Sequence, residues 1–566
     1  MSVPSSLAPV RVVRPIRSAV AAEGPDVSSF RNTLSTLARG ALVGLAAACT
    51  ALAVAELVSA LVRPAAAPVT VIGGAVVDRT PAPVKDFAIR TFGEDDKTVL
   101  QFGILVLLAV FASVLGTVAL RHRRTGALGV MAFGILGAAA ALSRPDSAGV
   151  GDALPSLAGA AAGAVVLAVL AGSFAAEGGA AGGAEAPVGP DTADAGTSGA
   201  EAPAYRDRRG FLTTAAVVAA ATGVGALGRW AARRRGRGAE ASRAGLVLPA
   251  PASPAPGLPR GTRLAVPGIS PFTTPNRDFY RVDTALVVPK VDADTWRLRV
   301  HGRGVARPRT FTLDDLLGRA LIERDITLTC VSNEVGGPYV GNARWLGVPL
   351  ADLLGELGVR PPSKGGPADQ LVARSVDGMT LGSPVEDVMD GRDAMLAVGM
   401  NGEPLPFEHG FPVRMLVPGL YGYVSACKWI EDIELTTFDA YDPYWVERRW
   451  ARRAPIKTQT RIDTPKAFAR APAGTVTVAG VAWAQHRGIT RVEIRVDDGP
   501  WQDADLAAAA GADTWRQWSY RWNATPGGHR LTVRATDGTG QVQTEERTRT
   551  IPDGASGRHS VFVTVA

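Results

Sequence analysis

The sequence predicts a multidomain protein with N-terminal transmembrane α-helices, then a mixed α+β domain, and then a C-terminal β-sandwich of immunoglobulin type. Ala, Val, Leu and Gly dominate the first part of the chain, where several apolar runs are long enough to cross a bilayer. Short helical and strand-like patterns then alternate, and only strand-like patterns follow them. We expect a membrane domain over residues 1–230, a basic and Pro-rich linker over 231–261, the α+β domain over 262–445 and the sandwich over 446–566.

Four apolar runs approach or reach the roughly 20 residues that a helix needs to span a membrane. Arg31 and Arg39 precede or begin the first run, and the sequence RHRR (121–124) follows the second. Basic residues are retained on the cytoplasmic side, so this pattern places the N-terminus in the cytoplasm. The runs lie at about residues 41–62, 99–120, 127–142 and 154–174.

A fifth apolar run begins RDRRGFLTTAAVVAAATGVGALG, residues 206–228, after a segment (177–204) whose composition suits a disordered linker. Paired arginines before Phe-Leu and an apolar stretch resemble a twin-arginine export signal, here internal and retained as a helix. An ordinary membrane helix with basic flanks has the same pattern. If the run crosses outward, everything from about residue 240 is extracytoplasmic, although the basic run at 233–237 then opposes the positive-inside rule. We expect a multi-pass protein of the cell membrane with extracytoplasmic globular domains.

The formal net charge of +7 comes largely from arginines that flank apolar segments. Such runs commonly meet anionic lipid, which favours a membrane over nucleic acid as the partner. The three cysteines, Cys49, Cys330 and Cys427, have no CxxC spacing. Neither a disulfide framework nor a CxxC metal site is expected.

The part of the chain after residue 262 has mixed patterns. DTWRLRVHG and DITLTC alternate like strands, whereas FTLDDLLGR and GVPLADLLGELG are typical of short amphipathic helices. DAMLAVGMNGEPLP predicts a strand that enters an Asn-Gly turn. After about residue 455 come four alternating runs separated by Gly, Asp and Pro turns, and we expect Trp483 and Trp515 to close the core of this cysteine-free sandwich.

Cys330 stands at the exit of the strand in ITLTCVSNEVGG, residues 326–337. A buried hydrophobic role is the usual one for a free cysteine. A thiolate that binds a soft metal or acts as a nucleophile instead needs an accessible sulfur in an electropositive setting. His409, Arg414 and Lys428, in one turn-rich segment, are residue types that hold an anion such as phosphate, although a solvated basic strand edge would have the same composition.

Together these segments resemble the sulfite oxidase family of molybdenum enzymes over residues 262–566. The resemblance rests on five motifs in order: TTPNRDFYRVDTALVVP, LTCVSN, NARWLGVPLADLL, MNGEPLPFEHGFPVRMLVPG with CKW, and a C-terminal domain with GVAW and VEIRVDDGPW. The expected class is therefore transmembrane helices, then a mixed α+β sulfite-oxidase-type molybdopterin domain, then the immunoglobulin-like sandwich.

The resemblance implies a molybdopterin cofactor, Mo-molybdopterin, whose metal is held by two dithiolene sulfurs and by the thiolate of Cys330. Ser-Asn and Gly-Gly in the loop that follows would let the cofactor approach. For Tyr280 and Arg281, a core aromatic and a surface ion pair are the alternatives. In relatives the pterin and its phosphate are held at positions that match Asn276, Tyr280, Arg281, Asp377, His409, Arg414 and the turn Ala426, Cys427, Lys428.

The loop after the cysteine departs from the family pattern. Sulfite oxidases have Ala-Gly-Asn and then a pair of arginines that help bind sulfite, whereas this chain keeps Asn333 but has Glu334 and Val335 where the arginines would be. A carboxylate there would repel sulfite, and Trp450 stands in the region of a metal-proximal tyrosine. We expect two-electron oxygen-atom transfer on a neutral or less anionic small molecule, for example of sulfoxide type.

Electron transfer is expected to involve another protein. The chain has no CxxCH motif, and His122 is the single histidine of the membrane part, so a bis-histidine haem within it is excluded. Arg344 either assists substrate binding or forms an ion pair. The alternative function is a non-catalytic surface protein that has lost its metal. A homodimer through the C-terminal domain is also plausible by resemblance.

Overall fold

The computed structural model describes residues 27–80, 84, 91, 96–144, 147, 149–179 and 204–566. They divide into two compact units. The first holds the described parts of Met1–Ala51, Leu105–Ala132 and Ala160–Thr222, and the second holds those of Leu52–Ile104, Phe133–Gly159 and Gly223–Ala566.

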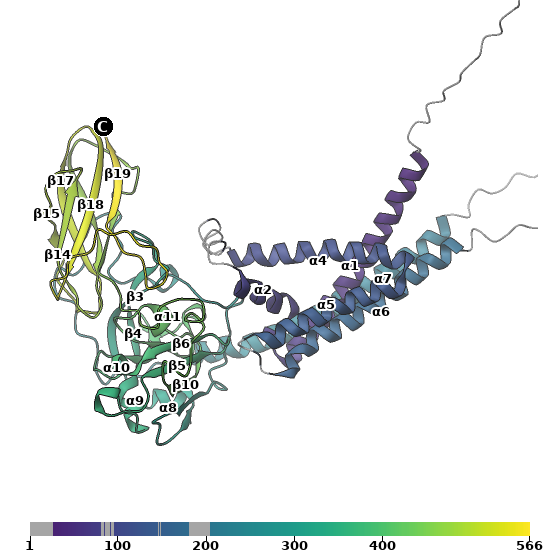
Figure 1. Cartoon of the computed structure of the whole chain (residues 1–566), viewed down its shortest axis with the longest axis horizontal. Helices are drawn as coiled ribbons and strands as arrows, with labels where there is room; N and C mark the ends of the chain where they lie inside the picture. The colour runs from purple at the N-terminus through teal and green to yellow at the C-terminus, as the bar shows by residue number, and fades with distance from the viewer. Residues whose placement is uncertain are drawn as a thin grey trace, which may run out of the picture. The chain divides into compact units, whose positions relative to one another are not determined.

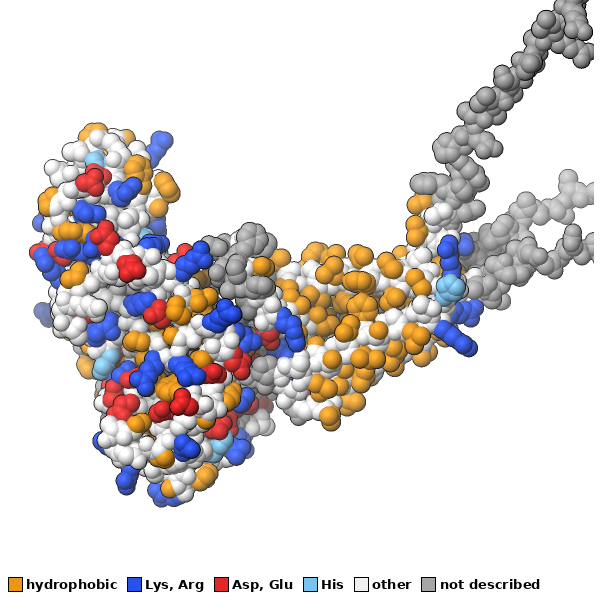
Figure 2. Space-filling model, in the orientation of Figure 1, with side chains coloured by type: hydrophobic (Ala, Val, Ile, Leu, Met, Phe, Trp, Pro, Cys, Tyr) orange, Lys and Arg blue, Asp and Glu red, His pale blue; other side chains and the backbone are white. Residues whose placement is uncertain are grey.

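Five helices are long and apolar enough to cross a membrane, as the sequence predicts. Their surface carries mainly hydrophobic side chains, whereas charged side chains gather over the globular part of the chain (Figure 2). A further helix, α2 (Pro68–Arg79), lies between the first two candidate spans. The candidate spans are Thr33–Val62 in α1 (Val27–Val62), Lys97–Arg121 in α4 (Asp96–Arg121), Arg123–Ser143, which is α5, Val150–Phe174 through α6 (Leu154–Gly179), and Thr214–Gly245 in α7 (Ala204–Gly245).

Helix α7 continues through the basic run to Gly245, so the first part of the predicted linker at 231–261 is helical. Ala, Arg and Glu are strong helix formers, and they outweigh Gly236 and Gly238, which lie before the final residue of the helix. The helix covers the twin-arginine-like motif, while most of the predicted linker at 177–204 lies outside the described residues. An extended chain follows Leu246.

Small residues set the helix packing inside the first unit. A Cβ atom on Gly44 would lie 1.8 Å from the Ala112 carbonyl oxygen, and one on Gly40 would lie 2.4 Å from Thr117 Oγ1. Close backbone approach at small residues is a common way for membrane helices to associate. The buried core of this unit consists of Val43, Ala46, Ala47, Ala119, Leu167, Leu170 and Ala171.

The α+β region is built on two sheets with short helices between the strands (Figure 1). One has the order β2-β1-β10-β5-β6, with β1 parallel to β10, and the other has the order β3-β4-β7-β8, with β9 also paired to β7. The strands are β1 (Leu298–Gly302), β2 (Arg309–Phe311), β3 (Ile322–Thr329), β4 (Val340–Pro349), β5 (Gln370–Ser375), β6 (Thr380–Pro384), β7 (Met395–Met400), β8 (Glu403–Pro404), β9 (Arg414–Leu416) and β10 (Ile430–Thr436), and the helices are α8 (Leu313–Leu317), α9 (Leu350–Glu356), α10 (Val385–Val388) and α11 (Gly422–Ser425).

Capping and turn residues in the sequence account for several ends of these elements. Thr312 caps α8 in a capping box with Asp315, and Asn401 and Gly402 both take positive φ angles in the predicted turn between β7 and β8. The junction with the sandwich differs from the prediction at residue 446. Ala454 and Ile456 belong to the core of the α+β region, and the first sandwich strand begins at Gln459.

The C-terminal region is the predicted β-sandwich of two sheets. One has the order β11-β13-β17-β16, and the other has the order β12-β19-β18-β14-β15. The strands are β11 (Gln459–Thr464), β12 (Arg470–Ala471), β13 (Gly474–Trp483), β14 (Ile489–Val496), β15 (Gln502–Asp503), β16 (Asp505–Leu506), β17 (Arg516–Ala524), β18 (Gly527–Asp537) and β19 (His559–Val565).

The prediction that Trp483 and Trp515 close the sandwich core is wrong. Both are buried in the core of the α+β region, and the sandwich core is filled by Trp518 and Trp522 instead. Side chains alternate faces along a strand, so Trp483 lies opposite its neighbour Ala482, which does face the sandwich core. The indole of Trp515 donates to the Phe272 carbonyl oxygen at 2.8 Å, which ties the two regions together.

Candidate functional site

Cys330 lies immediately beyond the last residue pair of the β3–β4 ladder, Thr329 with Val340. Its Sγ accepts a hydrogen bond from the Ser332 amide at 3.4 Å. The Asn333 side chain closes the loop, since its Oδ1 accepts a bond from the Tyr339 amide at 2.8 Å. The turn thus holds the sulfur just outside the sheet rather than within its packed interior.

Cys330 lines a cavity of about 470 Å³. Seven of the ten predicted site residues lie around this cavity, although they come from segments far apart in sequence. Cys330 follows the end of β3, Arg414 begins β9, Ala426 follows α11, and Lys428 precedes β10. The seven are Tyr280, Cys330, Asp377, His409, Arg414, Ala426 and Lys428.

The other three predicted residues do not line the cavity. Asn276 donates from its side chain to Glu403 Oε1 at 2.6 Å, and its carbonyl oxygen lies 3.0 Å from His409 Nε2. Arg281 pairs with Asp283 at 3.0 Å, and the Cys427 side chain is packed in the hydrophobic core. Asn276 and Arg281 therefore contact residues that line the cavity instead of lining it themselves.

Arg414 is a buried cation with little to neutralise it. Its Nη1 donates to the His409 carbonyl oxygen at 3.2 Å, its guanidinium lies over the Trp345 ring, and its Nε has no hydrogen-bond partner among the described residues. Burial lowers the pKa of Arg414 to about 10, so it stays charged at neutral pH. A buried charge normally requires a counter-charge, which makes this guanidinium suited to an anionic group of a ligand.

Lys428 forms an ion pair with Asp283, a residue that the sequence did not indicate as part of the site. Its Nζ donates to Asp283 Oδ2 at 2.9 Å, and Lys97 donates to the other oxygen of the same carboxylate at 2.5 Å. Burial disfavours the charged form of Asp283, but the two lysines outweigh it and hold the pKa of this carboxyl below its usual range. Burial lowers the pKa of Lys428 to about 8 although Asp283 opposes the shift.

His409 and Cys330 are both affected by burial. Burial, with help from Arg414, lowers the pKa of His409 to about 4, so the ring is neutral at pH 7. Its Nε2 faces the Asn276 carbonyl oxygen, which assigns the proton to that nitrogen. Burial raises the pKa of the Cys330 thiol, and the Ser332 amide partly offsets this. A bound metal ion would be the means of keeping this sulfur as a thiolate.

Apolar and aromatic side chains make up much of the remaining wall, including Tyr423, Tyr444, Trp445 and the predicted Trp450. The carboxylate expected beside the metal is not there, because Glu334 is exposed and does not line the cavity. Arg414 is the one arginine in the described lining. The described lining therefore has neither the predicted carboxylate nor a pair of arginines.

Arg344 fits the ion-pair alternative. Its guanidinium binds the Asp325 carboxylate through Nε at 3.1 Å and Nη2 at 2.8 Å, and it does not line the cavity. Ser375 and Thr284, which were not predicted, do line it. The Ser375 hydroxyl is buried without a hydrogen-bond partner among the described residues, whereas Thr284 donates to Asp377 at 3.1 Å.

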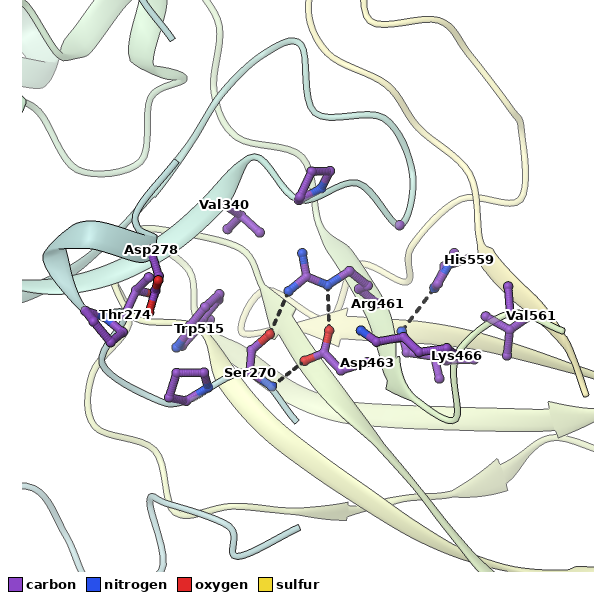
Figure 3. A pocket seen from close by; sticks show the side chains of 16 residues that line it. Ser270, Thr274, Asp278, Val340, Arg461, Asp463, Lys466, Trp515, His559 and Val561 are labelled. Carbon is purple, nitrogen blue, oxygen red and sulfur yellow. Dashed lines mark hydrogen bonds and ion pairs between the residues drawn. The ribbon is translucent and has the colours of Figure 1, made fainter. Parts of the chain in front are cut away.

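A second cavity, of about 480 Å³, lies where the α+β region meets the sandwich (Figure 3). Arg461 bonds Asp463 and Ser270 there, and His559 accepts a bond from the Ile462 amide. Burial lowers the pKa of His559 to about 4. The polar groups of Arg461 are used to join the two regions, and no cysteine lines this cavity.

Two protein families match parts of this chain. The family described as "Oxidoreductase molybdopterin binding domain" matches residues 285–445, and "Bacterial Ig domain" matches residues 459–533. Mitochondrial sulfite oxidase of Mus musculus is 30% identical over 291 residues, which cover 44% of this chain and 53% of that protein. An NADH nitrate reductase of Oryza sativa subsp. japonica is 34% identical over 180 residues, covering 28% of this chain and 19% of that protein.

Among solved structures, the sulfane dehydrogenase SoxCD from Paracoccus pantotrophus aligns with a TM-score of 0.45 at 25% identity, covering 52% of this chain and 82% of that chain. The chain spans about half the length of the mouse sulfite oxidase that it matches. The ordered motifs, the matched molybdopterin-binding domain and the similarity to sulfite oxidases support a sulfite oxidase-family molybdopterin oxidoreductase.

Proposed function

We propose that this protein is a membrane-anchored molybdenum oxidoreductase that transfers an oxygen atom in a two-electron reaction. The observation that carries the proposal is the position of Cys330, which follows the end of a strand and lines a cavity together with buried cationic side chains. Molybdopterin, when bound, would supply two dithiolene sulfurs and the metal at which oxygen transfer and the redox change occur.

The residues around the cavity suit this cofactor. Cys330 would give the metal a third sulfur ligand, and Arg414, with its unpartnered Nε, would bind the phosphate as a hydrogen-bond donor. The buried, unpartnered hydroxyl of Ser375 is a further donor for a polar ligand. Lys428 adds positive charge, and neutral His409 is oriented by the Asn276 carbonyl oxygen. The roles of Asn276, Arg281, Asp377, Ala426 and Cys427 in holding the pterin remain predictions.

Sulfite is not the substrate that this site favours. Sulfite oxidases have a pair of arginines for sulfite, whereas Arg414 is the one arginine in the described lining, and Lys97 and Lys428 already form ion pairs with Asp283. The aromatic side chains of Tyr423, Trp445 and Trp450 instead suit a neutral molecule such as a sulfoxide. Whether the enzyme oxidises or reduces its substrate would depend on the reduction potential of the protein that exchanges electrons with the metal.

That electron partner is a separate protein in this proposal, because the membrane part holds the single histidine His122 and the chain has no CxxCH motif. The helices would then anchor the enzyme in the cell membrane, with the cofactor domain outside the cytoplasm. A homodimer through the sandwich is the expected assembly.

Elemental analysis tests the proposal. The full chain, purified in detergent from a host that makes molybdopterin, is expected to hold about one molybdenum and one pterin per chain. Cys330→Ser should lose the metal or bind it weakly, whereas the matched control Cys49→Ser, in α1 and exposed, should keep it. Equal metal content in all three proteins would refute the role of Cys330, and absence of metal from all three would favour the non-catalytic alternative.

A further inference from the structure

Part of the wall of the Cys330 cavity comes from the membrane part of the chain. Helix α2, which connects the first two candidate spans, contributes Gly74, Val76 and Val77. Lys97 and Leu100 come from the first turns of α4, and they lie within the second candidate span itself. The cavity therefore reaches from the cysteine to the beginning of a membrane-spanning helix, all within one compact unit.

Polar contacts fix this wall to the cofactor-binding region. The Tyr444 hydroxyl donates to the Asp78 carboxylate of α2 at 2.5 Å, and Arg448 lies 3.9 Å from the same carboxylate. At the start of α4, Lys97 donates to Asp283 at 2.5 Å and to the Ala285 carbonyl oxygen at 2.7 Å. Since Tyr444 and Asp283 also line the cavity, these contacts hold α2 and the first turns of α4, together called the membrane connection, at the cavity wall.

The chemistry of this wall is apolar. Val76, Val77 and Leu100 are joined around the cavity by Val282 and Leu286 of the cofactor-binding region. Among the described lining residues, α2 and the start of α4 contribute one cation, Lys97, which shares the Asp283 carboxylate with Lys428 and Arg281. An anion entering on this side would lose its hydration beside apolar side chains and would meet a lysine that already forms an ion pair, whereas an uncharged molecule would bury apolar surface.

We propose, on the basis of the molybdenum function above, that the substrate is an uncharged, apolar small molecule that reaches the site along the bilayer. The connection between the first two spans selects for it through Val76, Val77 and Leu100. The enzyme would then act on molecules dissolved in the membrane or at its surface, and water-soluble anions would be poor substrates.

A series of dialkyl sulfoxides tests this with the full, molybdenum-loaded chain in lipid nanodiscs. Each turnover converts R₂SO, two protons and two electrons into R₂S and water, with reduced viologen dye as the electron donor. Full burial of an added methylene is worth about a fourfold gain in affinity, so kcat/KM should rise about twofold to fourfold per methylene until the cavity is filled. Oxidation of sulfite with an artificial acceptor should be at least about a hundredfold less efficient, as expected when an unpaired anion is desolvated.

Two variants in α2 test whether the cavity wall causes the dependence of kcat/KM on alkyl length. Val77→Asp places a carboxylate on the cavity wall and should reduce kcat/KM for the longest sulfoxide by about tenfold or more, with a much smaller loss for dimethyl sulfoxide. Val69→Asp, on α2 but outside the cavity lining, should keep the chain-length dependence of the wild type. Molybdenum content is measured for each protein, and it should match the wild type.

The outcomes are distinguishable. A rate that does not change with alkyl length, a preference for sulfite, the same loss in both variants, or no sulfoxide turnover by molybdenum-loaded enzyme would overturn the substrate proposal while the molybdenum function stands. Loss of molybdenum from the wild type would overturn both. A chain-length dependence that Val77→Asp removes and Val69→Asp keeps would support the proposal.

Discussion

Lys428 Nζ lies 2.9 Å from Asp283 Oδ2, and the two buried side chains line the same cavity as Cys330. The carboxylate also binds Lys97 from the beginning of α4. Asp283 thus forms ion pairs with Lys97, Lys428 and Arg281, and it joins the cofactor-binding region to the start of α4.

Asp283→Asn should lower the free energy of unfolding by about 3 kcal/mol or more, because removal of one partner leaves buried charges uncompensated. Chemical denaturation of the detergent-solubilised protein measures this. The control is Glu240→Gln, which removes a surface partner of Lys290 and should cost less than about 1 kcal/mol. Equal effects of the two variants would mean that the Asp283 pairs contribute no more than a solvated surface pair.

Arg414→Met should separate cofactor binding from stability. The unpartnered buried guanidinium is costly without an anion, so the cofactor-free variant should be as stable as the wild type or up to about 4 kcal/mol more stable. Its pterin content should nevertheless fall at least about tenfold, since a charge-assisted bond is lost. Arg344→Met is the contrast, because it leaves Asp325 unpaired and should reduce stability while pterin content is kept. A pterin content of Arg414→Met equal to the wild type would exclude the phosphate role.

Stability should fall as the pH decreases from about 6.5 towards 4. The buried rings of His409 and His559 have pKa values lowered to about 4, so in this window the unfolded chain binds more protons than the folded one. His559→Gln should reduce the slope of unfolding free energy against pH, as Gln can still accept the bond from the Ile462 amide. An unchanged slope between pH 4 and 6.5 would show that His559 does not carry this proton linkage.

Trp515→Phe should destabilise the protein more than Trp518→Phe. Both indoles are buried, but the Trp515 indole donates to the Phe272 carbonyl oxygen whereas Trp518 Nε1 has no partner among the described residues. The two changes remove similar volume, so the difference, about 1–3 kcal/mol, reflects the lost hydrogen bond. Thermal unfolding of both variants measures it, and a larger loss for Trp518→Phe would argue against this role of the indole.

Much of the architecture could be predicted from local patterns. Apolar length identified the candidate spans, and the alternating runs identified the sandwich. The motifs around Cys330 and Arg414 identified residues that the fold brings to one cavity. These features are encoded within short windows, where periodicity, turn residues and capping are informative.

Two kinds of feature could not be predicted. The Lys97–Asp283 pair joins residues 186 positions apart, and nothing in either local pattern indicates the other. The faces of Trp483 and Trp515 were assigned to the wrong core, because alternation shows that a strand has two faces but not which neighbour each face meets. The types of the elements could be predicted, but which distant segments pack against each other could not.

Molybdenum X-ray absorption spectroscopy on the purified full chain tests the central claim most directly. The wild type and Cys49→Ser should each have three sulfur atoms bound to molybdenum, two from the pterin and one from Cys330. Cys330→Ser should have two if it retains the metal. Three sulfur ligands in Cys330→Ser, or two in the wild type, would contradict the assignment of this cysteine as the protein ligand.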